Sequence, residues 1–267
     1  MSEPQPAGAS SAESKSWPNW LAGLALVAGL GVGLLALMSA MGIWLGWWDF
    51  RRSFDLLRIA NTSASWIAGA ALLITIALLI AGRGRAGSSL RLPSMALIGT
   101  ILAALAYYVP ESYRPPEGVK IPPIHDISTD TLNPPEFVAV LPLRADAPNS
   151  AVYGDSPDMD PAKLAQLQTE AYPDLKPLAV SEPPDVVFER ALAAVKQLNW
   201  ELVASSPGEG RIEATDTTFW FRFKDDVVIR ITPTAAGCVV DARSVSRVGR
   251  GDVGTNAKRL RALLALL

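Results

Sequence analysis

Hydrophobic residues are concentrated in the first part of the chain, where three long segments carry no charged side chain. These segments are Leu21–Trp48, Ser63–Ala81 and Leu92–Val109. Each contains about 18 residues or more, which is the length that an α-helix needs to cross a hydrocarbon core of about 30 Å. After residue 110 the pattern becomes polar and is interrupted by prolines. The pattern therefore predicts three transmembrane helices followed by a domain exposed to water.

Composition divides the chain into four regions. Residues 1–16 are rich in Ser, Ala, Pro and Glu, which predicts a disordered terminus. Residues 17–110 form the three-span membrane anchor, with spans at 21–48, 63–81 and 92–109. Residues 111–180 form a proline-rich linker or belt with one short helix, Pro161–Ala171, and it stays open whether this region is extended or packed. Residues 181–267 form the core of the water-exposed domain.

This core alternates between apolar and polar positions with the period of a β-strand. The pattern predicts helices at 185–198 and 252–267 and strands at 200–205, 211–217, 219–223, 227–232 and 238–247. The apolar face of the sheet would carry Ile212, Ala214, Phe219, Phe221, Phe223, Val227, Ile229, Ile231, Cys238, Val240 and Ala242. The polar face would carry Glu213, Arg222, Arg230, Asp241, Arg243 and Arg247.

An antiparallel sheet with one buried face produces this alternation, and the two helices would cover the buried face. We therefore predict an α+β fold with a two-layer domain after the three transmembrane helices. The arrangement resembles helix-grip modules, in which a curved sheet wraps a C-terminal helix. Likeness at the level of fold implies no function.

Charge around the spans predicts the orientation of the anchor. The connection Arg83–Arg91 is basic and contains no acidic residue, and short basic loops stay in the cytoplasm. The arginine and lysine counts on the two sides are nearly equal, so this connection decides the expectation. We expect an inner-membrane protein with a cytoplasmic N-terminus and a periplasmic C-terminal domain. We expect Asp49–Ile59 to be a loop, with a short interfacial helix as the alternative.

Composition also disfavours several functional classes. The spans contain no charged residue, which argues against a transporter or a pump. A net charge of −2 argues against nucleic-acid binding. One histidine and one cysteine cannot form a His/Cys zinc site, and no sequence motif points to a metal or a cofactor. Glycines in the first span either let helices approach closely or are simply tolerated there.

Two segments of the second half concentrate polar side chains. The first is His125–Asp130, and the second is Asp241–Ala257, where the last strand leads into the last helix. Arginines and hydroxyl groups beside a helix N-terminus suit an anion such as a phosphate, a carboxylate or a lipid headgroup. We expect Asp252 to be the N-cap of that helix. The candidate ligand-binding residues are His125, Asp126, Ser128, Thr129, Asp130, Arg243, Ser244, Ser246, Arg247, Arg250, Asp252 and Asn256.

The same residues have a structural interpretation, which the sequence favours over anion binding. The arginines would pair with carboxylates and hold the His125–Asp130 loop against the edge of the sheet. The carboxylates that we expect in this role are Asp126, Asp130, Glu213 and Asp241. Cys238 has a structural interpretation too, because it lies on the apolar face and would be a small buried side chain.

Both segments resemble the family called domain of unknown function 1499, which is found in bacterial and plastid-bearing lineages. The resemblance rests on His125–Asp130 with Asn133–Phe137, and on Asp241–Ala257 with Arg259 and Arg261 after it. It covers about residues 115–267. The family has no established activity, so the resemblance implies no substrate and no cofactor.

We therefore expect a bacterial envelope protein with a non-enzymatic binding or scaffold domain. Its partners would be the lipid bilayer and an anionic small molecule, a lipid headgroup or another membrane protein. One alternative is a hydrolase that uses His125 and Asp126 with a serine, although no nucleophile-elbow motif accompanies any serine. The other alternative is an accessory subunit of a larger membrane complex.

Overall fold

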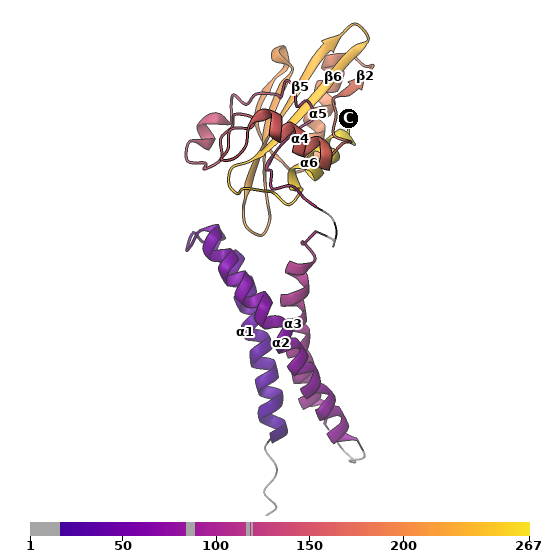
Figure 1. Cartoon of the computed structure of the whole chain (residues 1–267). Helices are drawn as coiled ribbons and strands as arrows, with labels where there is room; N and C mark the ends of the chain where they lie inside the picture. Colours follow the sequence, from indigo (N-terminus) through magenta and orange to yellow (C-terminus); the bar gives the residue numbers. More distant parts are fainter. Residues whose placement is uncertain (1–16, 84–88, 116–117, 119) are drawn as a thin grey trace, which may run out of the picture. The chain divides into compact units, whose positions relative to one another are not determined.

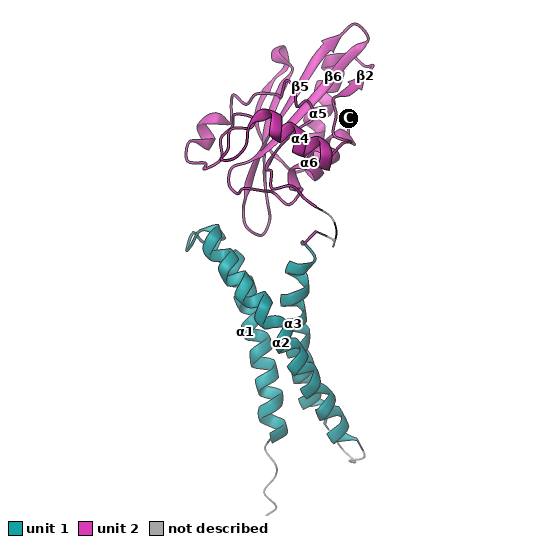
Figure 2. Cartoon of the chain, viewed as in Figure 1, with its two compact units in different colours: residues 1–113 teal, residues 114–267 magenta. Residues whose placement is uncertain are grey.

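The computed structural model describes residues 17–83, 89–115, 118 and 120–267. The chain forms two compact units, residues 1–113 and 114–267 (Figure 2). The predicted disordered terminus, residues 1–16, and residues 84–88 of the basic connection lie outside the described residues.

Unit 1 contains three helices that are long and apolar enough to cross a membrane (Figure 1). They are α1 (Trp17–Trp44), α2 (Phe50–Gly82) and α3 (Arg91–Glu111). The three predicted spans are thus confirmed as helices. α2 and α3 extend beyond the uncharged segments at both ends, whereas α1 begins before Leu21 and ends at Trp44, short of the predicted end at Trp48. Helices continue past the hydrocarbon core because backbone hydrogen bonding does not depend on side-chain polarity.

The segment Asp49–Ile59, which we expected to be a loop, is helical from Phe50 and continuous with the second span. Asp49 is the N-cap of α2, and its carboxylate accepts a hydrogen bond from the amide of Arg52 at 3.0 Å. The Trp48 indole donates to the Ser53 hydroxyl at 2.9 Å. The expectation of a loop was wrong because it relied on hydropathy, which distinguishes the charged arginines from the apolar residues of the span. Arginine and leucine both have a high helix propensity, so the helix continues through them.

Glycines bring α1 and α3 into close contact. A Cβ atom on Gly29 would lie 2.2 Å from the carbonyl oxygen of Gly99, and a Cβ atom on Gly99 would lie 2.1 Å from that of Ala25. No atom lies within 4 Å of the corresponding position on Gly31. Close helix approach thus accounts for Gly29, but it does not account for Gly31.

Unit 2 is built on an antiparallel sheet with the strand order β1-β6-β5-β4-β3, and β2 also pairs with β6. The strands are β1 (Asp126–Ser128), β2 (Leu178–Val180), β3 (Glu201–Ser206), β4 (Arg211–Thr217), β5 (Lys224–Thr234) and β6 (Gly237–Ser246). The predicted α+β fold with an antiparallel sheet is confirmed. The short strands β1 and β2 were not predicted, because three residues carry too little periodicity.

Helices cover one face of this sheet (Figure 1). They are α4 (Pro161–Ala171), α5 (Pro184–Gln197) and α6 (Thr255–Leu264). The core between helices and sheet contains most of the predicted apolar face, including Ile212, Ile229 and the buried thiol-bearing residue Cys238. Burial raises the pKa of the Cys238 thiol.

The opposite face of the sheet is also covered, although the alternation predicted a sheet with one buried face. Residues 129–155, which we call the belt, cross this face and include the 3₁₀ helix η1 (Leu141–Arg144). Phe137 and Val140 of the belt pack on Val228 and Val245 in a second small core. The proline-rich region is therefore packed here. Glu213, Asp241 and Arg243 of this face are buried beneath it, whereas Arg230 and Arg247 are half-buried and Arg222 is exposed.

The segment Phe219–Phe223, which we predicted to be a strand, forms a loop between β4 and β5. The amide of Thr218 donates to the carbonyl of Phe223 at 2.8 Å, and the amide of Phe223 donates to the Thr218 hydroxyl at 2.9 Å. Strand pairing ends at Thr217 and Lys224. The prediction was wrong because the alternating Phe residues match the period of a strand, but this period does not ensure that their backbone pairs with a neighbouring strand.

Candidate functional site

The two polar segments singled out in the sequence lie side by side. Strand β1 carries the first segment and pairs antiparallel with β6, so that Asp126 lies opposite Val245 and Ser128 lies opposite Arg243. The amide of Asp252 donates to the carbonyl of Ile124 at 3.2 Å, which holds the end of the second segment beside the start of the first. The sheet thus gathers the candidate residues at one edge.

Arg243 lies at the centre of this region and is 2 % exposed. Its Nε and Nη2 atoms donate to the two carboxylate oxygens of Asp126 at 2.8 and 2.7 Å. Its guanidinium also donates to the carbonyls of Pro135 at 3.2 Å and Ala151 at 2.8 Å, both in the belt. The predicted pairing with Asp126 is therefore present, and it also holds the belt.

Two aromatic rings flank the same guanidinium. The Phe137 and Tyr153 ring centroids lie 5.1 and 5.3 Å from the Arg243 Cζ atom. Cations are attracted to the faces of aromatic rings, and the attraction grows when water is excluded. Burial is the main cause that raises the pKa of the Tyr153 phenol, with Asp126 adding to it.

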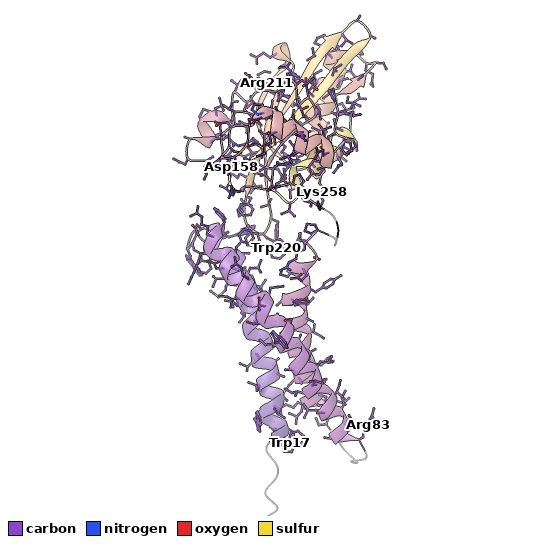
Figure 3. All side chains as sticks on the ribbon, in the orientation of Figure 1. Trp17, Arg83, Asp158, Arg211, Trp220 and Lys258 are labelled. Atoms are coloured by element: carbon purple, nitrogen blue, oxygen red, sulfur yellow. The ribbon has the colours of Figure 1, made fainter. Side chains whose placement is uncertain are left out.

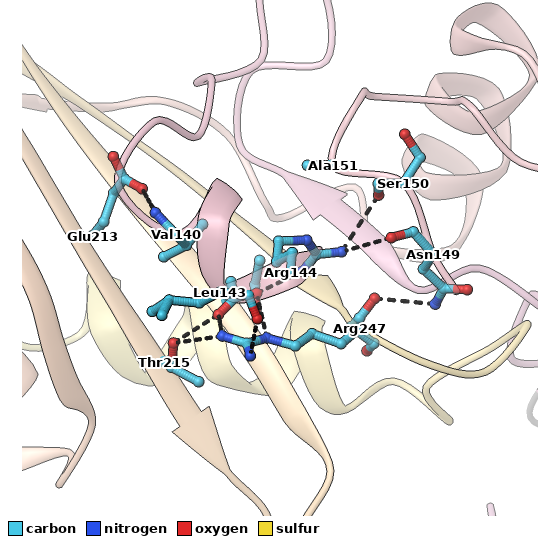
Figure 4. Close-up of polar contacts among 12 residues, drawn as sticks. Val140, Leu143, Arg144, Asn149, Ser150, Ala151, Glu213, Thr215 and Arg247 are labelled. Atoms are coloured by element: carbon cyan, nitrogen blue, oxygen red, sulfur yellow. Dashed lines mark hydrogen bonds and ion pairs between the residues drawn. The ribbon is translucent and has the colours of Figure 1, made fainter. Parts of the chain in front are cut away.

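Arg247 is held by a different carboxylate from those that the sequence indicated. Its Nε and Nη2 atoms donate to the two oxygens of Asp226 at 2.9 and 2.8 Å, and its Nη1 donates to the carbonyl of Leu143 at 2.7 Å (Figure 4). Arg144 of η1 donates to Asp226 at 2.6 Å from the belt side. One buried carboxylate thus joins the end of β6 to the belt.

Hydrogen bonds determine how Asp226 titrates. Burial alone would raise the pKa of this carboxyl group. Donors from Arg247, Thr215 and Arg144 outweigh burial and hold the pKa below its ordinary value. Asp226 is therefore ionised at neutral pH and balances part of the charge of the two arginines.

Asp130 and Asp241 share a third arginine, Arg230 of β5. The Nη2 atom of Arg230 donates to Asp241 at 2.8 Å and to Asp130 at 3.2 Å. Thr129 accepts a hydrogen bond from the amide of Ala242 at 2.9 Å. These contacts attach the second half of the His125–Asp130 segment to β6.

The serines and Asn256 form a network with Arg259 of α6. Ser244 donates to the Asn256 side-chain oxygen at 2.6 Å, and the Asn256 amide donates to Ser246 at 2.9 Å. Arg259 also donates to Asn256, to Ser244 at 3.3 Å and to Asp225 at 2.7 Å. The remaining candidate serine, Ser128, donates to the carbonyl of Asp130 at 2.8 Å. The three candidate serine hydroxyl groups are thus bonded within the fold.

Asp252 caps α6, although the N-cap position itself belongs to Gly254. The Asp252 carboxylate accepts hydrogen bonds from the amides of Gly254 at 2.8 Å and Asn256 at 2.7 Å. Burial raises the pKa of this carboxyl group, and the two amide hydrogen bonds oppose the rise. The prediction of Asp252 as N-cap was therefore wrong in position, because a left-handed turn at Gly254, with φ of 79°, lies between Asp252 and the helix. The chain's own carboxylate occupies the place where an anion would bind this helix end.

Only the outer part of the region remains open to solvent. Arg250 is an exposed side chain, and its Nη2 atom lies 3.5 Å from a carboxylate oxygen of Asp158, which is exposed as well. The Nδ1 atom of His125 lies 3.4 Å from the carbonyl oxygen of Arg250. A cavity of about 20 Å³ borders His125 and Asp126, which is room for about one water molecule.

The network also contains charged residues that were not among the candidate ligand-binding residues: Arg144, Asp225, Asp226, Arg230 and Arg259, together with Glu213 and Asp241, which were expected only as arginine partners. Glu213 illustrates the signal that could have found them, since it is a carboxylate between two buried apolar residues of β4, Ile212 and Ala214. Its side chain is fully buried and accepts hydrogen bonds from the amides of Val138, Ala139 and Val140 in the belt. Buried charges in strands require partners.

A groove lies at another part of unit 2, between the first turn of α5 and the turn that joins β3 to β4. It has a volume of about 800 Å³ and is open to solvent. Phe188 and Ile231, both buried, form its apolar floor. Asp185, Glu189 and Glu209 place carboxylates at its rim, and Glu209 is paired there with Arg211 at 2.6 Å. The pattern of residues gave no sign of this groove, because its walls come from segments that are far apart in the sequence.

Within the described part of the chain, no group of three or more His, Cys, Asp and Glu side chains is placed to hold a metal ion. The arrangement around Arg243 and Arg247 consists of ion pairs between protein groups. Its evident chemical role is to join β1, the belt and the sheet.

The model of the family described as protein of unknown function (DUF1499) matches residues 126–267. The chain belongs to this family. The match covers β1, the belt, the whole sheet and α6, so the buried arginine network lies within the DUF1499 domain. No curated protein and no solved structure matches the chain.

Proposed function

We propose that this membrane protein belongs to the bacterial envelope and that its DUF1499 domain is a non-enzymatic binding domain for a partner protein. The observation that carries the proposal is the groove between α5 and the β3–β4 turn. Its floor of Phe188 and Ile231 suits apolar side chains, and its carboxylate rim suits lysine or arginine. The partner would therefore present a segment with both apolar and basic residues.

The arginine network supports a partner protein over an anionic ligand or a lipid headgroup at the same residues. A small anion that approached Arg243 would have to displace Asp126, and one that approached Arg247 would have to displace Asp226. Both carboxylates are buried, so their displacement would leave charges without partners. For this reason we assign the network a structural role and place binding at the groove.

The hydrolase alternative has less support from the same contacts. Both carboxylate oxygens of Asp126 accept from Arg243, and His125 makes its own polar contact to the carbonyl of Arg250. A catalytic His–Asp pair would need a carboxylate oxygen directed at the imidazole. The accessory-subunit alternative is compatible with the proposal, since a subunit of a membrane complex could be the partner.

Site-specific photo-crosslinking in living cells tests the proposal. A photoreactive amino acid at Val186, on the groove, should yield a discrete crosslinked product of the full-length protein. The same group at Val152, an exposed apolar residue of the belt, should not yield that product. Exchange of Asp185 and Glu189 for lysine should abolish the product, whereas exchange of the exposed Glu136 and Glu201 should leave it. Equal products from both positions, or insensitivity to the rim charges, would contradict the proposal.

We also propose that the anchor lies in the inner membrane, with a cytoplasmic N-terminus and the DUF1499 domain in the periplasm. The basic connection Arg83–Arg91 supports this orientation. Alkaline phosphatase and a fluorescent protein that folds only in the cytoplasm, each fused after Leu267, distinguish the two orientations. Phosphatase activity without fluorescence is the expected result, and fluorescence without phosphatase activity would reverse the orientation.

A further inference from the structure

The loop between β4 and β5 combines an unusual composition with a closed backbone. Residues Thr218–Phe223, which we call the aromatic loop, contain four aromatic side chains and one arginine. The hydrogen bonds between Thr218 and Phe223 close its base, and the amide of Arg222 donates to the carbonyl of Thr218 at 3.1 Å. The loop therefore has a defined shape and is not a loose connection.

The aromatic side chains of this loop do not contribute to either hydrophobic core described for unit 2. Phe219 is 66 % exposed and Trp220 is 38 % exposed. Their rings meet edge to face with centroids 5.1 Å apart, and the rings of Phe221 and Phe223 lie 5.9 Å apart. Contiguous apolar surface of this kind marks a binding surface for another molecule or for a membrane.

Basic residues accompany the rings. Arg222 lies within the loop and Lys224 follows it, and both side chains are exposed. Tryptophan and phenylalanine next to lysine and arginine are the combination that favours the boundary between lipid headgroups and acyl chains. There the rings leave water while the cations remain near the phosphates.

The aromatic loop lies at the end of unit 2 where the chain arrives from the last span. The carbonyl of Lys224, at the base of the loop, accepts from the amide of Arg247, and the segment after Arg247 is bonded to Ile124 through Asp252. A Cβ atom on Gly251 would lie 3.1 Å from the Cα atom of Pro123. Figure 3 shows Trp220 and Lys258 at this end of unit 2 and Arg211 at the other.

We propose that the aromatic loop binds the interfacial region of the bilayer that the chain itself spans. Helix α3 ends at Glu111, and Ile121 is ten residues farther along the chain. Ten residues reach at most roughly 35 Å, so the tether between the last span and the domain is short. A tether of this length gives the loop a high effective concentration at the lipid. The covalent link to a membrane span is the reason for choosing lipid over a second protein as the occupant.

Fluorescence of a labelled loop in lipid vesicles tests this inference. Cys238 is buried, so a thiol-reactive, polarity-sensitive dye should label only an introduced cysteine. The dye is attached to full-length protein carrying Phe219→Cys or, as a matched control, Val186→Cys at the exposed groove. Each protein is then reconstituted into vesicles of phosphatidylcholine and phosphatidylglycerol. A phosphatidylcholine with a spin label near its headgroup serves as the quencher.

The dye at position 219 should emit at shorter wavelength and lose most of its intensity to the spin-labelled lipid. The dye at position 186 should keep a water-like emission and most of its intensity. Adding Trp220→Ser to the Phe219→Cys protein should weaken the quenching. If Phe219→Cys does not fold, the emission and quenching of a dye at Phe221→Cys give the same measurement at a second position of the loop. A shielded but unquenched dye would mean that protein covers the loop, and equal emission at positions 219 and 186 would mean exposure to water; either result overturns the proposal.

Discussion

The carboxylate of Asp126 and the guanidinium of Arg243 form a two-point ion pair at 2.8 and 2.7 Å between positions 117 residues apart. Asp126 is the first residue of β1, and Arg243 lies in β6. The pair is buried, and further donors of the same guanidinium bind the belt. This contact therefore adds a side-chain link between the paired strands β1 and β6 and attaches the belt to both.

Replacement of Arg243 by alanine should destabilise unit 2 strongly. The substitution leaves Asp126 buried without a cation and two belt carbonyls without a donor. Removal of one partner from a buried ion pair costs about 3–5 kcal/mol. Thermal and denaturant unfolding of the full-length protein, followed by the fluorescence of a dye on unit 2, would measure the loss.

The matched control is Arg250→Ala in the same segment, because the Arg250 side chain is 86 % exposed. This change should alter the free energy of unfolding by less than about 0.5 kcal/mol. The double substitution Asp126→Leu with Arg243→Met should recover part of the loss, since it leaves no charge without a partner. An Arg243→Ala protein as stable as the Arg250→Ala protein would show that the ion pair contributes nothing.

The stability of unit 2 should fall on acidification, in part because of Asp226. Its pKa is lower in the folded protein than in the unfolded chain, where an aspartate titrates near pH 3.9. The ionised carboxylate therefore contributes stability that is fully present above about pH 4 and is lost as the pH falls through the folded pKa. Asp226→Asn should be less stable at pH 7 and should lose less stability below pH ~4.

Denaturant unfolding at a series of pH values would measure this effect. Asp155→Asn is the control, because Asp155 is exposed and outside the ion pairs described for unit 2. The control protein should keep the acid dependence of the parent protein. If Asp226→Asn keeps it too, the buried carboxylate is not the group that links stability to pH.

Glu213 should control the attachment of the belt. Its carboxylate accepts from the amides of Val138, Ala139 and Val140 and from the side chain of Arg211. In Glu213→Ala these donors lose their acceptor, at about 1–3 kcal/mol for each buried group that stays unsatisfied. Hydrogen–deuterium exchange of the belt should therefore become faster around residues 138–144 while β5 stays protected.

The control is Glu209→Ala, which removes only an exposed partner of Arg211 and should leave the belt protected. Unchanged exchange in Glu213→Ala would contradict the role of Glu213 in attaching the belt.

Local periodicity was enough to predict the longer regular elements of unit 2, but not the short strands β1 and β2 or the start of α2 at Phe50. The predicted helix Pro161–Ala171 and the predicted strand Arg211–Thr217 have the bounds found in the structure. Both depend on residues that are close together in the sequence. The loop Thr218–Phe223 has the same alternation as a strand, and only the absence of strand pairing distinguishes it.

The candidate site could be predicted only in part, because ion pairs depend on register. The sequence suggested Asp126 as an arginine partner, and Arg243 binds it. Arg247 binds Asp226 instead, and this follows from the β5–β6 register, which pairs Asp225 with Ser246. The belt has no periodicity at all, so its packing over the polar face could not be read from the pattern of residues.

Gly99 should be essential for the packing of α3 against α1. A Cβ atom there would lie 2.1 Å from the carbonyl oxygen of Ala25, which is backbone and cannot move aside without shifting the helix. Gly99→Val should therefore separate the helices, at a cost of about 1–3 kcal/mol. Gly31→Val is the control, because no atom lies within 4 Å of a Cβ atom at that position. Hydrogen–deuterium exchange of α1 and α3 in membranes would report the separation: the exchange rates should rise in Gly99→Val and stay at those of the parent protein in Gly31→Val. Equal rates in both proteins would mean that the glycine contact does not determine how these two helices pack.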